Sequence, residues 1–278
     1  MSHLIDCMHL GHDRVIGAYE IDGLIVDPGP TTCVQTLLAG LAEEPRALLI
    51  THIHLDHAGA SGSLVERFPG LRVYVHELGA PHLVDPAKLL DSAARLYGDD
   101  MDRLWGDVLP VPQNNIVALS GGEEIEGFRV AYAPGHASHH VAYLHQASGD
   151  AYVGDVAGVC IPPSDFTVAP TPPPDIDVEA WEESLAAVAA WRPNSLCLTH
   201  FGRREDVAEQ LERLRQSLRS NAERARRSDR GRFLEEAEAE IDSRLGDEVA
   251  ARVRQAAPSD HRWLGLERYW RNRPPTAT

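Results

Sequence analysis

The segment 51–59 reads THIHLDHAG and gathers three histidines and one aspartate within six positions. The apolar run at 46–50 precedes it and predicts a short buried strand, whereas residues 64–68 after it predict a helix. Ligands collect beyond the ends of strands in open α/β sheets. If the strand geometry persists, the side chains of His52 and His54 point the same way and can reach one ion together.

Asp56 and His57 lie beyond that turn and can face a neighbouring point. The pattern therefore predicts two metal ions side by side. The alternative is a histidine-rich loop without metal, but so many imidazoles and a carboxylate are costly to gather without a cation to share.

The spacing His52-x-His54-x-Asp56-His57 resembles the signature of the metallo-β-lactamase superfamily of metal-dependent hydrolases. Further motifs of that superfamily follow in the expected order, and together they cover about residues 14 to 202. They are Asp27 in IVDPG, His136 in APGH, Asp155 in VGD and His200 in LTHFG.

The resemblance implies an αββα sandwich with two divalent metal ions. It assigns His52, His54 and His136 to the first ion, and Asp56, His57 and His200 to the second. Asp155 would bridge both ions, and Asp27 would support the metal loop from behind. Zinc is the expected metal, with iron and manganese as alternatives, because imidazole and carboxylate ligands suit all three.

The pattern of periodicity divides the chain into a catalytic part and a helical extension. We expect the catalytic domain at 1–202, with a helical insertion at 77–110, and the extension at 203–278. A Pro-rich loop at 161–174 should run over the mouth of the site. We expect a second sheet made of hairpins from the strands at 115–119, 128–132, 140–145 and 151–154.

The large side chains of the insertion are the expected lining of a substrate pocket. Tyr97 and Trp105 are the residues we assign to it, and the alternative is that they only pack the insertion onto the sheet. His139 and His140 follow His136 closely, and we assign both to packing or to support of the ligands.

The C-terminal third carries apolar residues at helical spacing between 205 and 256. These stripes predict two or three helices that pack on the core or on a partner, so a homo-oligomer formed through them is a further expectation. The extension resembles the helical C-terminal domain of the hydroxyacylglutathione hydrolase branch.

Composition narrows the classes of partner. The chain has 278 residues and a net charge of -16, and an acidic surface repels the phosphates of nucleic acids. No apolar run is long enough for a membrane helix, and the first residues do not resemble a signal peptide. We therefore expect a soluble, cytoplasmic protein that acts on a small molecule.

The predicted reaction is hydrolysis of an ester, thioester or lactone by a hydroxide bound to the dinuclear centre, with thioesterase and lactonase activities as the classes implied. Two metal ions can lower the pKa of a shared water from 15.7 to about 7. Asp56 would orient that hydroxide and so act as a catalytic residue. The alternatives are an iron-dependent oxygenase of the persulfide dioxygenase type and a non-catalytic metal-binding protein.

Overall fold

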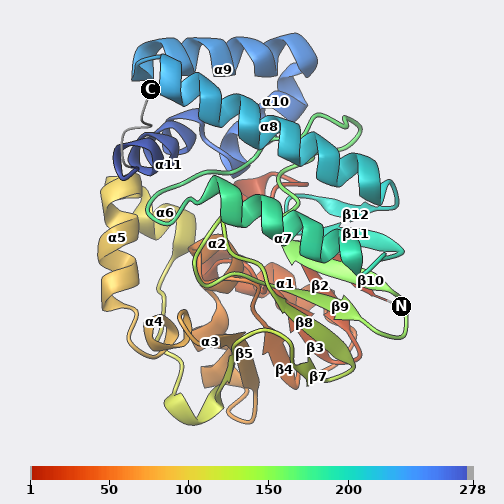
Figure 1. Ribbon diagram of the computed structural model, residues 1–278. Helices are drawn as coiled ribbons and strands as arrows, with labels where there is room; N and C mark the ends of the chain where they lie inside the picture. The colour runs from red at the N-terminus through yellow and green to blue at the C-terminus, as the bar shows by residue number, and fades with distance from the viewer. Residues whose placement is uncertain (1, 274–278) are drawn as a thin grey trace.

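The computed structural model describes residues 2–273 and consists of two six-stranded sheets packed face to face with helices outside (Figure 1). The expected αββα sandwich with a helical insertion and a helical C-terminal extension is confirmed. Aromatic and aliphatic side chains from the inner faces of both sheets form the core between them, including Tyr19, Phe128, Tyr143 and Tyr152.

The first sheet has the order β1-β2-β3-β4-β5-β6. Strands β3 to β6 run parallel, and β1 and β2 are antiparallel to their neighbours. The strands are β1 (His3–Asp6), β2 (Gly17–Ile21), β3 (Leu24–Val26), β4 (Ala47–Leu49), β5 (Arg72–His76) and β6 (Ile116–Leu119). The outer face is covered by α1 (Val34–Gly40), α2 (Leu55–Ala58) and α3 (Ser61–Arg67).

The second sheet has the order β12-β11-β10-β9-β8-β7. It is antiparallel except between β10 and β11, which are parallel because α7 (Val178–Ala190) connects them. The strands are β7 (Glu124–Ile125), β8 (Phe128–Tyr132), β9 (Val141–His145), β10 (Asp150–Gly154), β11 (Ser195–Leu198) and β12 (Gly202–Arg204).

The strand predicted at 115–119 lies in the first sheet and not in the second, so its assignment was wrong. It forms β6, which pairs in parallel with β5 from Val73↔Ile116 to His76↔Leu119. The helical insertion between β5 and β6 carries the chain back to the end of the sheet where β5 begins, as a connection between parallel strands requires. Alternation of apolar residues is the same in either sheet and cannot distinguish the two.

The insertion between these two strands is helical, as predicted. It contains α4 (Ala80–Val84), α5 (Ala87–Tyr97) and α6 (Met101–Trp105). Short 3₁₀ turns at His9–Gly11, Thr31–Cys33, Gly98–Asp100 and Gln113–Asn115 complete this half of the molecule.

Up to residue 273, the C-terminal extension consists of four helices: α8 (Val207–Arg227), α9 (Arg230–Arg244), α10 (Asp247–Ala256) and α11 (Ser259–Arg271). Helix α8 lies beside α7 on the outside of the second sheet (Figure 1). Its Leu211, Leu214 and Leu218 share one buried cluster with Trp181 of α7. The apolar stripes of the extension therefore pack on the core, whereas the domain boundary after residue 202 stays a prediction.

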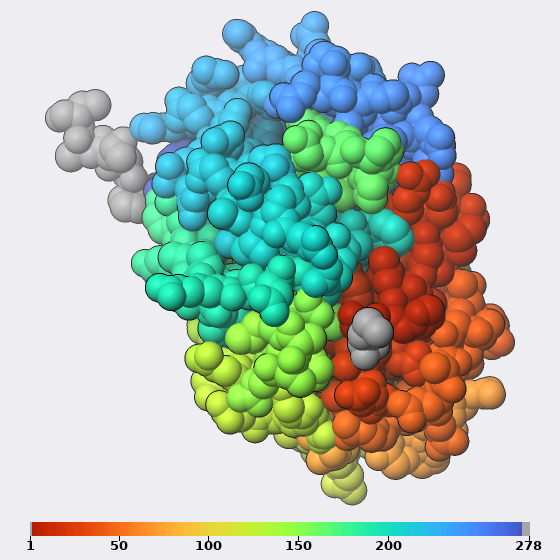
Figure 2. Space-filling model, turned by 90° about the vertical axis from the view of Figure 1, so that its right-hand side faces the viewer, coloured from red at the N-terminus to blue at the C-terminus, as the bar shows by residue number. Residues whose placement is uncertain are grey.

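The N-terminal residues pack against this extension (Figure 2). Arg252 Nε donates to the carbonyl oxygen of Asp13 at 2.8 Å, and His12 Nδ1 lies 2.6 Å from Gln255 Oε1. Within residues 2–273, none of the helices combines the length and the apolar character that a bilayer crossing requires.

Candidate metal centre

All seven predicted ligands lie in loops or in the short helix α2, beyond the ends of strands of the two sheets. The fold therefore brings together residues that are far apart in sequence. His52 and His54 follow β4, Asp56 and His57 lie in α2, His136 lies between β8 and β9, Asp155 follows β10, and His200 follows β11.

Three overlapping groups of side chains could each hold an ion, because their ligand atoms lie within 4.8 Å of one another. The groups are His52, His54 and His136; His52, His57 and Asp155; and Asp56, His57 and His200. The cluster therefore fits a dinuclear divalent metal site.

Asp155 lies between the two halves of this cluster. Its Oδ1 is 3.3 Å from His57 Nε2 and 3.5 Å from His200 Nε2, whereas its Oδ2 is 3.2 Å from His136 Nε2. One carboxylate thus offers an oxygen to each side, which is the geometry that a bridging ligand needs.

Three buried polar atoms in the centre lack any hydrogen-bond partner among the described residues. They are His57 Nε2, His200 Nε2 and Asp155 Oδ1. Buried polar atoms are almost always paired, because an unpaired one loses its hydration without compensation. A cation that accepts their lone pairs removes this cost, so the residues present fit bound metal ions.

Asp27 holds the segment Thr51–His57 in place through hydrogen bonds at both of its ends. It is fully buried, and its Oδ1 accepts a hydrogen bond from the backbone N–H of Thr51 at 2.8 Å. Its Oδ2 accepts from the hydroxyls of Thr51 and Thr199 at 2.7 and 3.0 Å and lies 2.8 Å from His57 Nδ1. This contact leaves Nε2 of His57 to face the cluster.

Backbone carbonyls orient two further imidazoles in the same way. His136 Nδ1 lies 2.9 Å from the carbonyl oxygen of Pro170, and His200 Nδ1 lies 2.6 Å from that of Val15. In each ring the other nitrogen is turned toward the cluster, as is common for metal-binding histidines.

The electrostatics of the cluster favour a cation. Burial, followed by the neighbouring imidazoles, lowers the pKa of His52 well below its usual value, and the same causes lower the pKa of His54 to about 4. Burial also lowers the pKa of His57, but Asp56, Asp155 and Asp27 outweigh it and raise that pKa. The neutral rings of His52 and His54 can offer their lone pairs directly, whereas His57 must lose its proton when a cation binds beside the three carboxylates.

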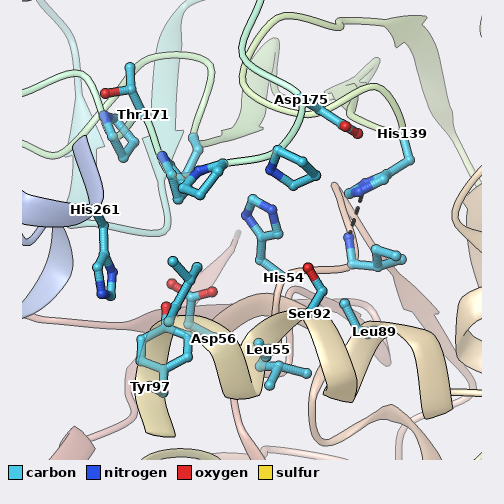
Figure 3. A pocket seen from close by; sticks show the side chains of 18 of the residues that line it. His54, Leu55, Asp56, Leu89, Ser92, Tyr97, His139, Thr171, Asp175 and His261 are labelled. Atoms are coloured by element: carbon cyan, nitrogen blue, oxygen red, sulfur yellow. Dashed lines mark hydrogen bonds between the residues drawn. The ribbon is translucent and has the colours of Figure 1, made fainter. Parts of the chain in front are cut away.

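The cluster opens into a cavity of about 300 Å³ (Figure 3). His54 and Asp56 lie at its floor, and Leu89, Ser92 and Tyr97 of α5 form one wall. The loop Pro170–Asp175 forms another wall, as expected for the Pro-rich segment over the mouth.

Of the two residues assigned to the pocket from the sequence, only Tyr97 lines it. Trp105 is 6% exposed and packs behind Tyr97, with ring centroids 5.0 Å apart. It also stacks on His9 at 5.5 Å. The assignment of Trp105 needs correction, because its ring is buried in a cluster with Leu55 and Ala93 and does not line the cavity.

Sequence reasoning missed His261, which reaches the cavity from α11 (Figure 3). It lies in an amphipathic helix and belongs to no motif, so only the packing of α11 beside α5 reveals it. His139 also lines the cavity, yet it accepts a 3.4 Å hydrogen bond from the Ile53 N–H and belongs to none of the ligand groups. His140 Nε2 accepts from the Asp155 N–H at 3.3 Å.

Solved structures share this fold. A crystal structure of an archaeal metallo-beta-lactamase superfamily protein from Sulfolobus tokodaii matches with a TM-score of 0.70 and 22% identity, over 95% of this chain and 97% of that one. A protein crystallised in a di-iron-bound form matches with a TM-score of 0.55 and 25% identity, over 77% of this chain and 92% of the other.

Curated relatives match over shorter stretches. A metallo-beta-lactamase fold-containing protein of Sulfurisphaera tokodaii is 30% identical over 56% of this chain and 60% of that protein. A hydroxyacylglutathione hydrolase of a Synechococcus strain is 32% identical over 49% of this chain and 45% of the hydrolase. The chain thus spans about half the length of these relatives.

The profile of the metallo-beta-lactamase superfamily matches residues 18–201, which is more than half of the chain and contains all seven predicted ligands. Together with the geometry of the cluster and the shared sandwich, this match shows that the chain belongs to the metallo-beta-lactamase superfamily.

Proposed function

We propose that this protein is a metal-dependent hydrolase that cleaves a thioester, ester or lactone bond of a small molecule. The observation that carries the proposal is the set of buried atoms of His57, His200 and Asp155 that make no hydrogen bond. They converge beneath a cavity that Asp155 helps to line and that is large enough for a small substrate.

In this proposal one ion is held by His52, His54, His136 and Asp155. The other is held by Asp56, His57, His200 and the same Asp155. Two bound divalent ions supply Lewis acidity and an activated water at neutral pH. We propose zinc because the ligands are imidazoles and carboxylates in a site that opens onto a cavity, as catalytic zinc sites do. Iron is the second choice, since a structural relative is known in a di-iron-bound form.

Asp56 is the residue we propose to orient the attacking water. Its side chain is 21% exposed and faces the cavity. Burial alone would raise its pKa, but His57 and His200 outweigh this effect and keep the pKa well below its usual value. Asp56 therefore stays ionised and can accept a hydrogen bond from water beside the scissile bond.

Tyr97, on the cavity wall formed by α5, can supply a hydrogen-bond donor. Burial, and then the charges of Asp56 and Asp155, raise its pKa well above the ordinary value, so the hydroxyl keeps its proton. It can donate a hydrogen bond to a substrate oxygen.

The four cysteines are buried, and none of them is among the residues that line the cavity within the described chain.

The first substrates to test are thioesters of glutathione, because relatives named hydroxyacylglutathione hydrolase are 31–32% identical over nearly half of this chain. Lactones and carboxylic esters form the second group. A cytoplasmic location, a homo-oligomer through the C-terminal helices and the lack of nucleic-acid binding stay predictions.

The test combines metal analysis with product analysis. Protein purified without chelator and reloaded with zinc or iron is expected to hold two ions per chain and to hydrolyse at least one class of substrate. In ¹⁸O-labelled water the label should enter the product acid, and no acyl group should remain on the protein. Asp56→Asn should retain its fold and lose most of the activity.

Three results would contradict the proposal. A covalent acyl adduct on any residue would replace water by a protein nucleophile. Consumption of dioxygen with a persulfide substrate would move the protein to the oxygenase alternative. Metal binding without turnover of any substrate class would favour the non-catalytic alternative.

A further inference from the structure

A second cavity, of about 230 Å³, lies outside the metal centre between the Pro-rich loop and helices α8, α9 and α11. Its wall mixes apolar and polar side chains. The polar ones include three guanidinium groups, three hydroxyls and the carboxylates of Asp165 and Glu240. The residues that matter here are Thr167, Arg213, Ser217, Ser220, Arg244 and Arg262.

Arg262 is the unusual member of this wall. It is 3% exposed, and its Nη2 donates to Ser259 Oγ at 2.6 Å. Its Nε is buried without a partner, and no ion pair joins it to a carboxylate anywhere in residues 2–273. Burial lowers the pKa of Arg262 to about 10, so it still carries its charge at neutral pH.

The nearby carboxylates do not neutralise this charge directly. Glu240 lies in the wall, but its Oε2 accepts from Arg224 Nη2 at 2.7 Å. Glu238 accepts from Ser259 Oγ and from Arg254 Nε. A buried charge without an ionic partner is destabilising, and a ligand of opposite charge would compensate it.

The rest of the wall offers what an anion needs. Arg244 and Ser220 are exposed at the entrance, and the Nε of Arg213 is buried without a partner. Guanidinium groups bind the oxygens of phosphate and carboxylate groups through paired hydrogen bonds. The carboxylates of Asp165 and Glu240 also line this cavity. Glu240 pairs with Arg224 and Arg213 pairs with Asp206, so Arg262 and Arg244 are the guanidinium groups left to bind an anion.

We propose that this second cavity binds an oxyanion, namely the phosphate or carboxylate group of a small molecule, with Arg262 as its buried anchor and Arg244 at its entrance. The site is separate from the metal centre, and its existence does not depend on the hydrolase function proposed above.

The site is connected to the metal centre through the segment Ala169–Thr171. Arg262 also borders the first cavity, and its carbonyl oxygen accepts from the Thr171 hydroxyl at 3.1 Å. Ser217 Oγ, in the wall of the second cavity, accepts from the Ala169 N–H at 3.0 Å. The next carbonyl, of Pro170, orients His136 at 2.9 Å. An occupant should therefore tighten one wall of the first cavity.

The test is calorimetric titration of the metal-loaded full chain, in a buffer without oxyanions, with inorganic phosphate and separately with a dicarboxylate such as succinate. Anions also bind metal ions, so variants must locate the site. Arg262→Gln should weaken binding of the preferred anion by about tenfold or more, the scale of a lost charge-assisted hydrogen bond. Arg244→Gln should weaken it less, and the matched control Arg129→Gln, exposed on β8, should not change it.

Circular dichroism and a thermal melt of each variant check the fold, and Arg244→Gln carries the test alone if Arg262→Gln does not fold. Tighter binding of phosphate or of succinate identifies the chemical class. Equal affinity in Arg262→Gln, Arg244→Gln and the original chain would place the anion at the metal ions and overturn the proposal. Absence of saturable binding for both anions would overturn it as well.

Discussion

At the scale of single residues, Asp155 occupies the most connected position in the metal centre, because its two oxygens face opposite halves of the cluster. We predict that Asp155→Ala lowers the metal content by more than one equivalent per chain. His139→Ala should leave the metal content unchanged, because His139 lines the cavity without joining any ligand group. Elemental analysis after metal reloading measures both. Equal loss in the two variants would contradict the bridging position of Asp155.

Asp27 acts on the centre through His57 and the loop that begins at Thr51. Asp27→Asn keeps the size of the side chain but removes a negative charge and a hydrogen-bond acceptor. We predict a 10- to 100-fold loss of metal affinity, the usual effect of removing such outer support. Competition with a chromogenic chelator measures the affinity. An affinity equal to that of the original chain would show that the backbone alone orients His57.

The residues nearest the metal centre were the easiest to predict, because His52 to His57 lie within one short stretch. Residues so close in sequence are also close in the folded chain, so their spacing alone predicts that they lie together. Trp105 shows the opposite case: an aromatic residue in a helix can face a cavity or the core, and α6 buries it against Tyr97 and Leu55. Only the packed orientation of the helix decides between the two.

At the scale of elements, α5 contributes Tyr97 to the wall of the cavity, whereas α6 contributes Trp105 to the packing behind it. Tyr97→Phe should raise KM for the hydrolysed substrates and leave the thermal stability unchanged, because only the cavity-facing hydroxyl is lost. Trp105→Ala should lower the stability by about 3–5 kcal/mol, the cost of emptying a buried aromatic site. Steady-state kinetics and denaturant unfolding separate the two effects. A Tyr97→Phe variant that lost stability and kept KM would reverse these roles.

Helix α8 begins beside a small ionic network centred on Asp206. Burial opposes ionisation, but Arg204 and Arg213 outweigh it and lower the pKa of Asp206 to about 2. Arg204 Nη2 lies 2.7 Å from Asp206 Oδ2. The folded-state pKa is below the unfolded value of 3.8, so the stabilisation is complete above that value and is lost as the pH falls toward 2.

Asp206→Asn should therefore lower the stability by about 1 kcal/mol or less at pH 6, a small effect because the group is partly exposed. The difference from the original chain should shrink when both are unfolded at pH 3. Urea unfolding at the two pH values measures it. A difference that grows at pH 3 would assign the effect to something other than this ion pair.

Apolar periodicity largely predicted the order of helices and strands along the chain, but it did not predict which elements pack together. The strand at 115–119 was expected, yet its place beside β5 follows from the parallel crossover through the insertion. The same limit hid α11: its sequence predicts an amphipathic helix, but no local pattern shows that His261 reaches the first cavity.

At the scale of the whole molecule, the C-terminal helices share one core with the second sheet. Leu211, Leu214 and Leu218 of α8 pack with Trp181 and with buried residues of β9, β10 and β11. The N-terminal residues also contact α10 through Arg252 and Gln255. The extension thus covers the sandwich from two sides, and its last helix supplies part of both cavities.

A chain that ends after Arg204 tests whether the catalytic part folds alone. It would expose the cluster around Trp181, and each buried leucine of α8 that it loses contributes about 1.5–3 kcal/mol. Three such losses equal much of the 5–15 kcal/mol that stabilises a typical domain. We predict that the fragment is insoluble or lacks a cooperative melt, and that co-expression of residues 205–278 restores soluble, metal-binding protein. A soluble fragment that melts cooperatively and binds two ions would instead establish an independent domain that ends near residue 202.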